Sequence, residues 1–242
     1  MSAIKTINLT KKYSNKIAVN DLNLDVNEGE LFALLGVNGA GKTTTIKMLS
    51  CIAKPTSGDA LLLGNSIVKE SEEIKKNINI SPQETAVAPN LTVKENLEFI
   101  AGVYGQNKQK AKSNSKIMAD TFNLTDEMNT KSKKLSGGTK RRLSLAMALI
   151  SNPKILFLDE PTLGLDVLSR RELWNVIKTL KGKVSIVLTT HYLDEVEALS
   201  DRVGIMTKGK LSEVGTVSEI LEKTNAKSLE DAFVMLSGGY HE

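Results

Sequence analysis

Short apolar runs separated by polar turn residues dominate the beginning of the chain. Residues 4–9, 22–26 and 31–35 have the length and composition of β-strands, and Asn, Asp and Gly lie between them. This pattern predicts a small N-terminal antiparallel β layer. After Gly41 the pattern changes to a helix over residues 44–49, which ends before the proline and glycine punctuation of residues 54–58.

The middle of the chain has a different periodicity. From about residue 85 to residue 150, apolar positions recur at intervals of three and four, which is the spacing of amphipathic helices. The clearest examples are Val93, Leu97 and Ile100, followed by Leu143, Ala146 and Leu149. We therefore expect a helical insertion over this segment.

Strand and helix patterns alternate in the last third of the chain. The expected strands are residues 155–158, 184–188 and 203–206, and the expected helices between them are residues 170–180 and 193–199. Such alternation is typical of a parallel sheet. A last helix opens at Ser228, presents Leu229, Ala232, Phe233 and Leu236 on one face, and is expected to stop at Gly238 and Gly239.

These patterns predict an α/β fold in which helices flank a mostly parallel sheet. We expect a single domain over residues 1–242. Its core would consist of residues 1–84 and 151–242, and residues 85–150 would form a helical subdomain. A chain of this length buries a sizeable core without disulfides or structural metals.

Composition narrows the class of protein only slightly. Hydrophobic residues make up 40% and charged residues 25% of the chain, close to globular averages, and the formal net charge of +4 gives no evidence for nucleic acid. The single cysteine, Cys51, excludes an internal disulfide, and we expect it to be a buried thiol in a reducing compartment. Neither a membrane-length apolar run nor a signal peptide is present, which predicts a cytoplasmic location.

A glycine-rich loop lies between the strand 31–35 and the helix that follows it. Residues 36–43 match the phosphate-binding pattern G-x-x-x-x-G-K-[ST] in the strand-loop-helix context that this pattern requires. Lys42 is expected to reach the β- and γ-phosphates, and the Thr43 hydroxyl to bind Mg²⁺. The residues expected to bind nucleotide here are Gly36, Asn38, Gly39, Ala40, Gly41, Lys42, Thr43 and Thr44.

Two carboxylates end the apolar strand 155–158. Asp159 is expected to bind Mg²⁺ and Glu160 to act as the general base for the attacking water. The carboxyl edge of an open α/β sheet is where ligands bind. On its own this pair is weak evidence, because many buried strands end at solvated acids.

A serine and two glycines precede the helical pattern around Leu143. This segment, Ser136, Gly137 and Gly138, resembles the signature motif of the ATP-binding-cassette superfamily, and the resemblance extends from Tyr13 to the last helix. It implies a P-loop NTPase core and a second ATP-binding subunit, whose γ-phosphate the signature segment contacts. Thr139 stands where many members of the family have glutamine, which we interpret as a tolerated variant.

The resemblance assigns roles to four further residues. Gln83 is similar to the glutamine that contacts Mg²⁺ and water, and His191 to the histidine that contacts the γ-phosphate and restrains Glu160. Asp166 resembles the aspartate near the partner's phosphate loop, although it also has the position of a helix N-cap. Tyr13 resembles the aromatic residue that stacks on adenine; the alternative is a tyrosine at a strand edge. Trp174 lies on an apolar helical face and is expected in the core.

The function that the resemblance implies is ATP binding and hydrolysis, coupled to separate transmembrane permease subunits. Residues 228–233 resemble export-type cassettes that handle drugs, antimicrobial peptides or sodium ions. The expected partners are ATP, a second ATP-binding subunit in a homodimer and the permease, with no nucleic acid, at the inner face of the cell membrane.

Two other classes of protein stay open at this point. A soluble cassette ATPase without a transporter is the main alternative, although such proteins usually carry two linked cassettes or a long coiled-coil insertion. An ordinary P-loop kinase or GTPase would account for Lys42 and Asp159 but would leave residues 135–138, Gln83 and His191 unexplained.

Overall fold

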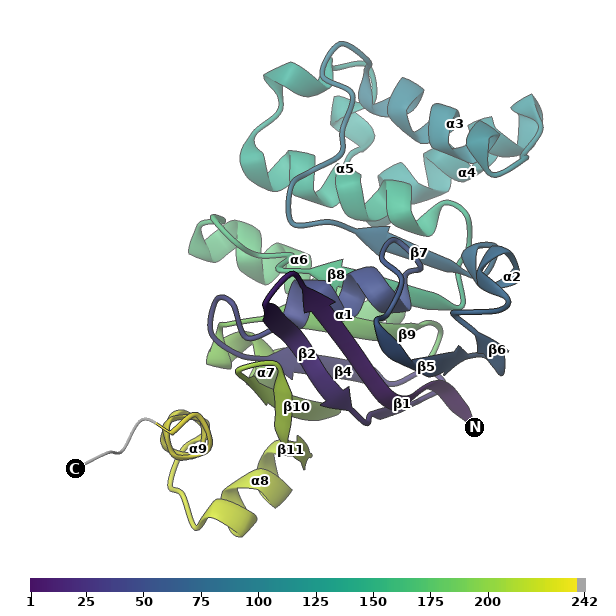
Figure 1. Cartoon of the computed structure of the whole chain (residues 1–242). Helices are drawn as coiled ribbons and strands as arrows, with labels where there is room; N and C mark the ends of the chain where they lie inside the picture. Colours follow the sequence, from purple (N-terminus) through teal and green to yellow (C-terminus); the bar gives the residue numbers. More distant parts are fainter. Residues whose placement is uncertain (239–242) are drawn as a thin grey trace.

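The computed structural model describes residues 1–238 and consists of two sheets, a helical block and a C-terminal pair of helices (Figure 1). The predicted α/β fold with an antiparallel N-terminal sheet is confirmed. The expected end of the last helix at Gly239 lies outside the described residues. Within residues 1–238, no helix combines the length and the apolar character needed to cross a membrane.

The antiparallel sheet is built around the long first strand, which pairs with three others. Its strands are β1 (Ser2–Tyr13), β2 (Lys16–Leu22), β3 (Asp25–Asn27), β5 (Ser57–Leu62) and β6 (Asn65–Ser66). The predicted strand over residues 22–26 is wrong, because β2 ends at Leu22 and β3 begins at Asp25. Between them, the Thr6 hydroxyl donates to Leu22 O (2.8 Å) and accepts from Leu24 N (2.7 Å), so a side chain replaces regular pairing.

The second sheet has the order β11-β10-β4-β9-β8-β7 and is parallel from β10 to β7. Its strands are β4 (Leu31–Leu35), β7 (Ile78–Ser81), β8 (Ile155–Asp159), β9 (Ser185–Thr190), β10 (Arg202–Thr207) and β11 (Lys210–Gly215). We did not predict β7 or β11. Because β4, β8 and β9 are parallel neighbours, the segments that follow them meet at one edge of the sheet.

Within residues 1–238, nine α-helices of 5 to 14 residues surround the sheets. They are α1 (Lys42–Leu49), α2 (Ser71–Lys75), α3 (Val93–Val103), α4 (Lys108–Thr121), α5 (Gly137–Leu149), α6 (Val167–Leu180), α7 (Leu193–Leu199), α8 (Val217–Thr224) and α9 (Leu229–Leu236). Helices α3, α4 and α5 form the helical block beyond β7 (Figure 1). The segment predicted to be helical is therefore helical.

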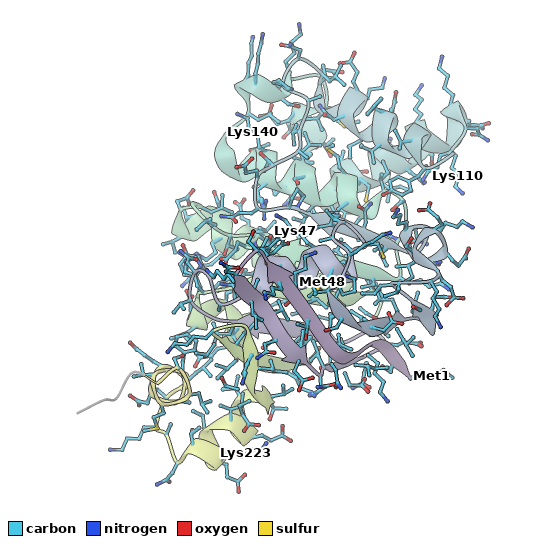
Figure 2. All side chains as sticks on the ribbon, viewed as in Figure 1. Met1, Lys47, Met48, Lys110, Lys140 and Lys223 are labelled. Atoms are coloured by element: carbon cyan, nitrogen blue, oxygen red, sulfur yellow. The ribbon has the colours of Figure 1, made fainter. Side chains whose placement is uncertain are left out.

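Both faces of the parallel sheet are buried, as its continuous apolar strands require. Phe157 of β8 and Val187 of β9 belong to the cluster shared with the antiparallel sheet and α1, in which Met48 lies between the sheets (Figure 2). Leu156 and Leu188, the alternate residues of the same strands, belong to the cluster that includes α5 and α6. The strands β8 and β9 are thus packed against other elements on both faces of the sheet.

Smaller sequence predictions have mixed outcomes. The predicted apolar face of α9 is confirmed, since Leu229 and Ala232 are buried in a third cluster against which Phe233 and Leu236 pack. Cys51, which follows α1, is partly rather than fully buried, and burial raises the pKa of its thiol.

The packing of β8 predicts a measurable loss of stability. Replacing the fully buried Phe157 by alanine should lower the free energy of unfolding by about 3–5 kcal/mol, because the change removes apolar burial and leaves a cavity between the sheets. Urea unfolding followed by circular dichroism measures this change. The control Leu168→Ala, at a residue that is 73% exposed, should change it by less than about 0.5 kcal/mol. Equal effects of the two variants would contradict the described core.

Candidate active site

The glycine loop between β4 and α1 is held tightly against its neighbours. Gly41 has a φ of 111°, and a Cβ atom there would lie 2.5 Å from the carbonyl oxygen of Ala18 in β2. A Cβ atom on Gly36 would lie 2.5 Å from the carbonyl oxygen of Met206 in β10. Glycine is therefore required for the loop to approach both strands and open the amino end of α1 to solvent.

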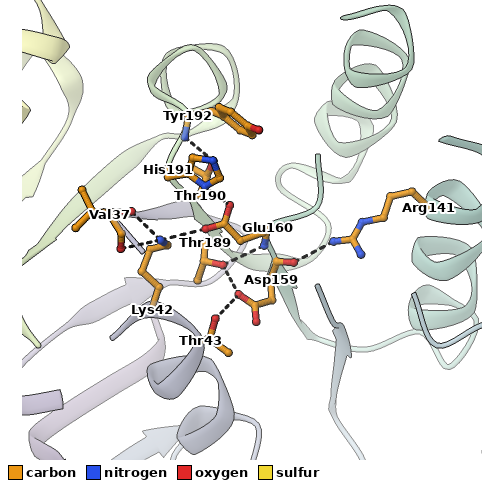
Figure 3. Close-up of polar contacts among 11 residues, drawn as sticks. Val37, Lys42, Thr43, Arg141, Asp159, Glu160, Thr189, Thr190, His191 and Tyr192 are labelled. Atoms are coloured by element: carbon orange, nitrogen blue, oxygen red, sulfur yellow. Dashed lines mark hydrogen bonds and ion pairs between the residues drawn. The ribbon is translucent and has the colours of Figure 1, made fainter. Parts of the chain in front are cut away.

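Lys42 is the first residue of α1, and its ammonium group is buried within the loop (Figure 3). Its Nζ donates to the carbonyl oxygens of Gly36 (2.6 Å) and Val37 (3.3 Å). The same atom lies 3.1 Å from Oε1 of Glu160. The loop and the end of β8 are thus joined by one buried cation.

Glu160 occupies the centre of the site. It follows β8 with a φ of 49°, in the left-handed region, and its backbone N–H donates to both the carbonyl and hydroxyl oxygens of Thr189 (3.1 Å each). Its carboxylate is only 6% exposed, with Oε1 at Lys42 and Oε2 2.7 Å from Nδ1 of His191. The side chain is therefore fixed from two directions.

Asp159 and Thr43 supply oxygen atoms on the other side of the loop. The hydroxyls of Thr43 (3.1 Å) and Thr189 (2.6 Å) both donate to Oδ1 of Asp159 (Figure 3). Within residues 1–238, no group of three or more His, Cys, Asp or Glu side chains could hold a metal ion. A carboxylate and a hydroxyl nevertheless fit Mg²⁺, which keeps several waters and takes further oxygens from bound phosphates.

A cavity of about 520 Å³ opens beside these residues, and most of the residues predicted to bind nucleotide line it. It is lined by Tyr13, Lys16, Ala18, Asn38, Gly39, Ala40, Gly41, Lys42, Thr43, Thr44, Gln83, Glu160, Leu163 and His191. Tyr13 is 47% exposed at its mouth, as a stacking platform must be. We did not predict Lys16, although the β1–β2 hairpin pairs it directly with Tyr13.

Six predicted residues do not line this cavity: Ser136, Gly137, Gly138, Asp166, Gly36 and Asp159. The first three begin α5, where Ser136 is an exposed N-cap. The N-cap alternative for Asp166 is confirmed, because its Oδ1 accepts from the N–H groups of Leu168 and Ser169 (3.0 Å each) at the start of α6. One chain therefore carries the cavity beside the glycine loop and, separately, a second exposed helix terminus.

Arg141 is a further site residue that we did not predict. Its guanidinium is 4% exposed and donates to the carbonyl oxygens of Pro161 (2.6 Å), Asp159 (3.0 Å), Pro82 (2.5 Å) and Gln83 (3.1 Å). Burial lowers the pKa of Arg141 to about 10. Its position one turn into α5 after the Ser136 motif is the only sequence signal for this role.

Trp174 connects α6 to the buried acid of α7. It is partly buried against the core cluster, as expected, and its Nε1 donates to Oε1 of Glu195 (3.1 Å). Burial of Glu195 raises the pKa of that carboxyl group.

The fold and the cavity together define a P-loop nucleoside triphosphatase, and the comparisons with known proteins specify which kind. Residues 19–163 match the family model described as ABC transporter. The chain therefore belongs to the ABC transporter family, as an ATP-binding cassette that hydrolyses ATP.

Known proteins resemble the chain over most of its length. It is 42% identical over 230 residues to human phospholipid-transporting ATPase ABCA3, covering 93% of this chain and 14% of that protein. It is 39% identical over 241 residues to the probable multidrug ABC transporter ATP-binding protein YbhF of Escherichia coli (strain K12), covering 97% of this chain and 42% of that protein. The chain thus spans less than half of either relative.

Two solved structures share the fold. An ATP binding subunit of an ABC transporter superposes with a TM-score of 0.86 at 27% identity, covering 97% of this chain and 99% of that one. The cassette MJ0796, in a dimeric post-hydrolysis state bound to ADP and Pi, gives a TM-score of 0.80 at 25% identity, covering 88% and 98%.

The hydrogen bonds of Arg141 predict that it holds the site together. Arg141→Ala should lower the free energy of unfolding by about 3 kcal/mol or more, because several buried carbonyl groups lose a charged donor. Arg141→Lys should recover only part of this loss, since an ammonium group cannot span the same carbonyls. Chemical unfolding measures both variants, with Arg171→Ala on the exposed face of α6 as the control. An Arg141→Ala protein as stable as this control would contradict the assignment.

Proposed function

We propose that this cassette binds Mg-ATP in the described cavity, closes on a second copy of itself and thereby drives separate transmembrane subunits. The observation that carries the proposal is the carboxylate of Glu160, buried between Lys42 and His191 at the mouth of the phosphate loop. A base held at this point is positioned to act on a water molecule beside the terminal phosphate.

The cavity lining supports a specific arrangement of the nucleotide. Tyr13 would stack on the adenine, and the N–H groups at the start of α1 would surround the phosphates. Thr43, Asp159 and Gln83 would hold Mg²⁺, partly through water. When bound, the ion neutralises charge on the β- and γ-phosphates.

Hydrolysis then follows from the positions of the side chains. The ammonium group of Lys42 moves from Glu160 to the arriving phosphates, which frees the carboxylate. Glu160 accepts a proton from the attacking water while the water oxygen forms a bond to the γ-phosphorus. The bond between the γ-phosphorus and the oxygen that bridges it to the β-phosphate breaks. His191 restrains Glu160 and contacts the γ-phosphate. The bridging oxygen leaves with ADP, and the γ-phosphoryl group becomes free phosphate.

The location of the signature segment supports the homodimer. Ser136, Gly137 and Gly138 lie outside the cavity of their own chain, as does Asp166. The start of a 13-residue helix with exposed donors attracts an anion, and the γ-phosphate held by a second copy would supply one. The MJ0796 cassette is described as dimeric with ADP and Pi, which supports the same assembly here.

The names of the relatives support a transport function. ABCA3 is named a phospholipid-transporting ATPase and YbhF a probable multidrug transporter component. We propose that this cassette powers export from the cytoplasmic face of the membrane, as the resemblance of residues 228–233 to export-type cassettes implies. Residues 85–150 would then act as a unit that moves relative to the α/β core.

An apolar face of the helical block is the proposed docking surface for the transmembrane subunit. Phe99 (61%), Val103 (65%) and Tyr104 (42%) expose large apolar side chains at the end of α3. Beside them lies a cavity of about 130 Å³, lined in part by Tyr104 and by Pro82, the neighbour of Gln83. A subunit bound there would contact the segment that carries Gln83 and could sense the state of the nucleotide.

Substitutions in the cavity separate binding from turnover. Glu160→Gln should retain ATP binding and lower turnover at least about 100-fold, because the base is lost and the loop is intact. Lys42→Ala should weaken binding itself. Nucleotide affinity and phosphate release measure the two effects, and the Glu160→Gln protein should become dimeric with ATP on a sizing column. Unaltered turnover in Glu160→Gln would remove the general-base role.

Recovery of the tagged chain from gently solubilised host membranes tests the partner. A multi-span membrane protein in stoichiometric amount is the expected result, and Phe99→Asp should abolish its recovery, because a charge would be buried at the docking surface. Ile117→Asp is the matched control on an exposed apolar residue of α4. Ribosomes, DNA or no membrane protein would favour a soluble cassette ATPase.

A further inference from the structure

The first turn of α5 contains a hydrogen bond between two hydroxyl groups. Ser136 Oγ lies 2.8 Å from Thr139 Oγ1, and the same serine oxygen accepts from the backbone N–H of Thr139 (3.1 Å). Ser136 is exposed, whereas Thr139 is 9% exposed. The N–H bond alone completes the helix cap, so the Thr139 hydroxyl is not needed for capping.

Either hydroxyl could donate in this hydrogen bond, and the neighbouring charges favour donation by Thr139. Nη2 of Arg142 donates to Thr139 Oγ1 (3.4 Å), and Nη1 of Arg142 pairs with Glu172 of α6. A guanidinium has no acceptor, so Thr139 Oγ1 receives this bond and its own proton is free to point at Ser136. Ser136 Oγ then accepts two hydrogen bonds, which occupy both of its lone pairs. Its proton is left to donate away from the helix.

We propose that Thr139 is a positioning residue that sets the Ser136 hydroxyl as a donor toward an anion. The series Glu172, Arg142, Thr139 and Ser136 carries this polarity from α6 to the exposed tip of α5. The inference rests on the proposed function, in which the anion is the γ-phosphate held by a second copy of the chain. Thr139 is thereby an active part of the signature segment and not only a tolerated replacement for glutamine.

The hydroxyl of Thr139 can be removed without changing the shape of its side chain. Thr139→Val in the Glu160→Gln protein should weaken the ATP-dependent dimer, because the Ser136 proton loses its fixed direction. Loss of one such hydrogen bond costs about five-fold per site, and a symmetric dimer contains the site twice, so the dimer dissociation constant should rise about 25-fold. Sedimentation at saturating Mg-ATP measures it.

Three companion variants separate positioning from a structural effect. Thr139→Ser, which restores the hydroxyl, should return the dissociation constant to that of Glu160→Gln. Thr121→Val, on the exposed part of α4, is the matched control and should leave it unchanged. In a Ser136→Ala background, Thr139→Val should have no additional effect, because Thr139 acts through Ser136. Thermal melting and nucleotide affinity report whether each variant is folded.

The outcomes distinguish this inference from the function on which it rests. A folded Thr139→Val protein that dimerises as tightly as Glu160→Gln would overturn the role of Thr139 alone. So would a Thr139→Val effect that is equally large with and without Ser136. A Glu160→Gln protein that stays monomeric with Mg-ATP would overturn the proposed dimer and, with it, the anion that Ser136 is said to contact.

Discussion

The structure depends above all on the burial of a carboxyl group, that of Glu160, at the end of β8. Glu160 has almost no contact with water, and a buried charge persists only where an opposite charge and hydrogen-bond donors surround it. Lys42 and His191 satisfy these requirements, and they come from the segments that follow the neighbouring strands β4 and β9. The parallel order of β4, β9 and β8 is what brings the three together.

Arg141 extends the same constraint to the helical block. It belongs to α5, yet all of its hydrogen bonds reach backbone carbonyls of the segments that carry Gln83 and Glu160. Displacement of α5 would therefore pull on both segments, because a buried guanidinium that loses its hydrogen-bond acceptors costs much free energy. These contacts would give the proposed transmembrane subunit a continuous physical route to the nucleotide site.

The helix that carries Arg141 also presents Ser136 at its exposed amino end, outside the cavity lining. In the proposed dimer, nucleotide binding in one copy and anion contact by the other would both act on the amino-terminal part of α5. The donors at this end are arranged by side chains of α5 and α6 together, because Arg142 pairs with Glu172. The geometry of the signature segment is consequently a property of two packed helices.

The amino-acid sequence by itself determined the α/β class, the helical segment and the ligand loop, because these follow from local periodicity and from glycines, a lysine and a threonine at close spacing. It did not reveal the break between β2 and β3, where the Thr6 hydroxyl replaces ladder bonds, nor the strands β7 and β11, whose short runs lack a clear alternation. Only the tertiary structure decided that Arg141 binds the Gln83 and Glu160 segments and that Lys16 borders the cavity. Those contacts join residues far apart in the chain or facing each other across a hairpin, and their energies depend on burial and geometry that no local pattern encodes.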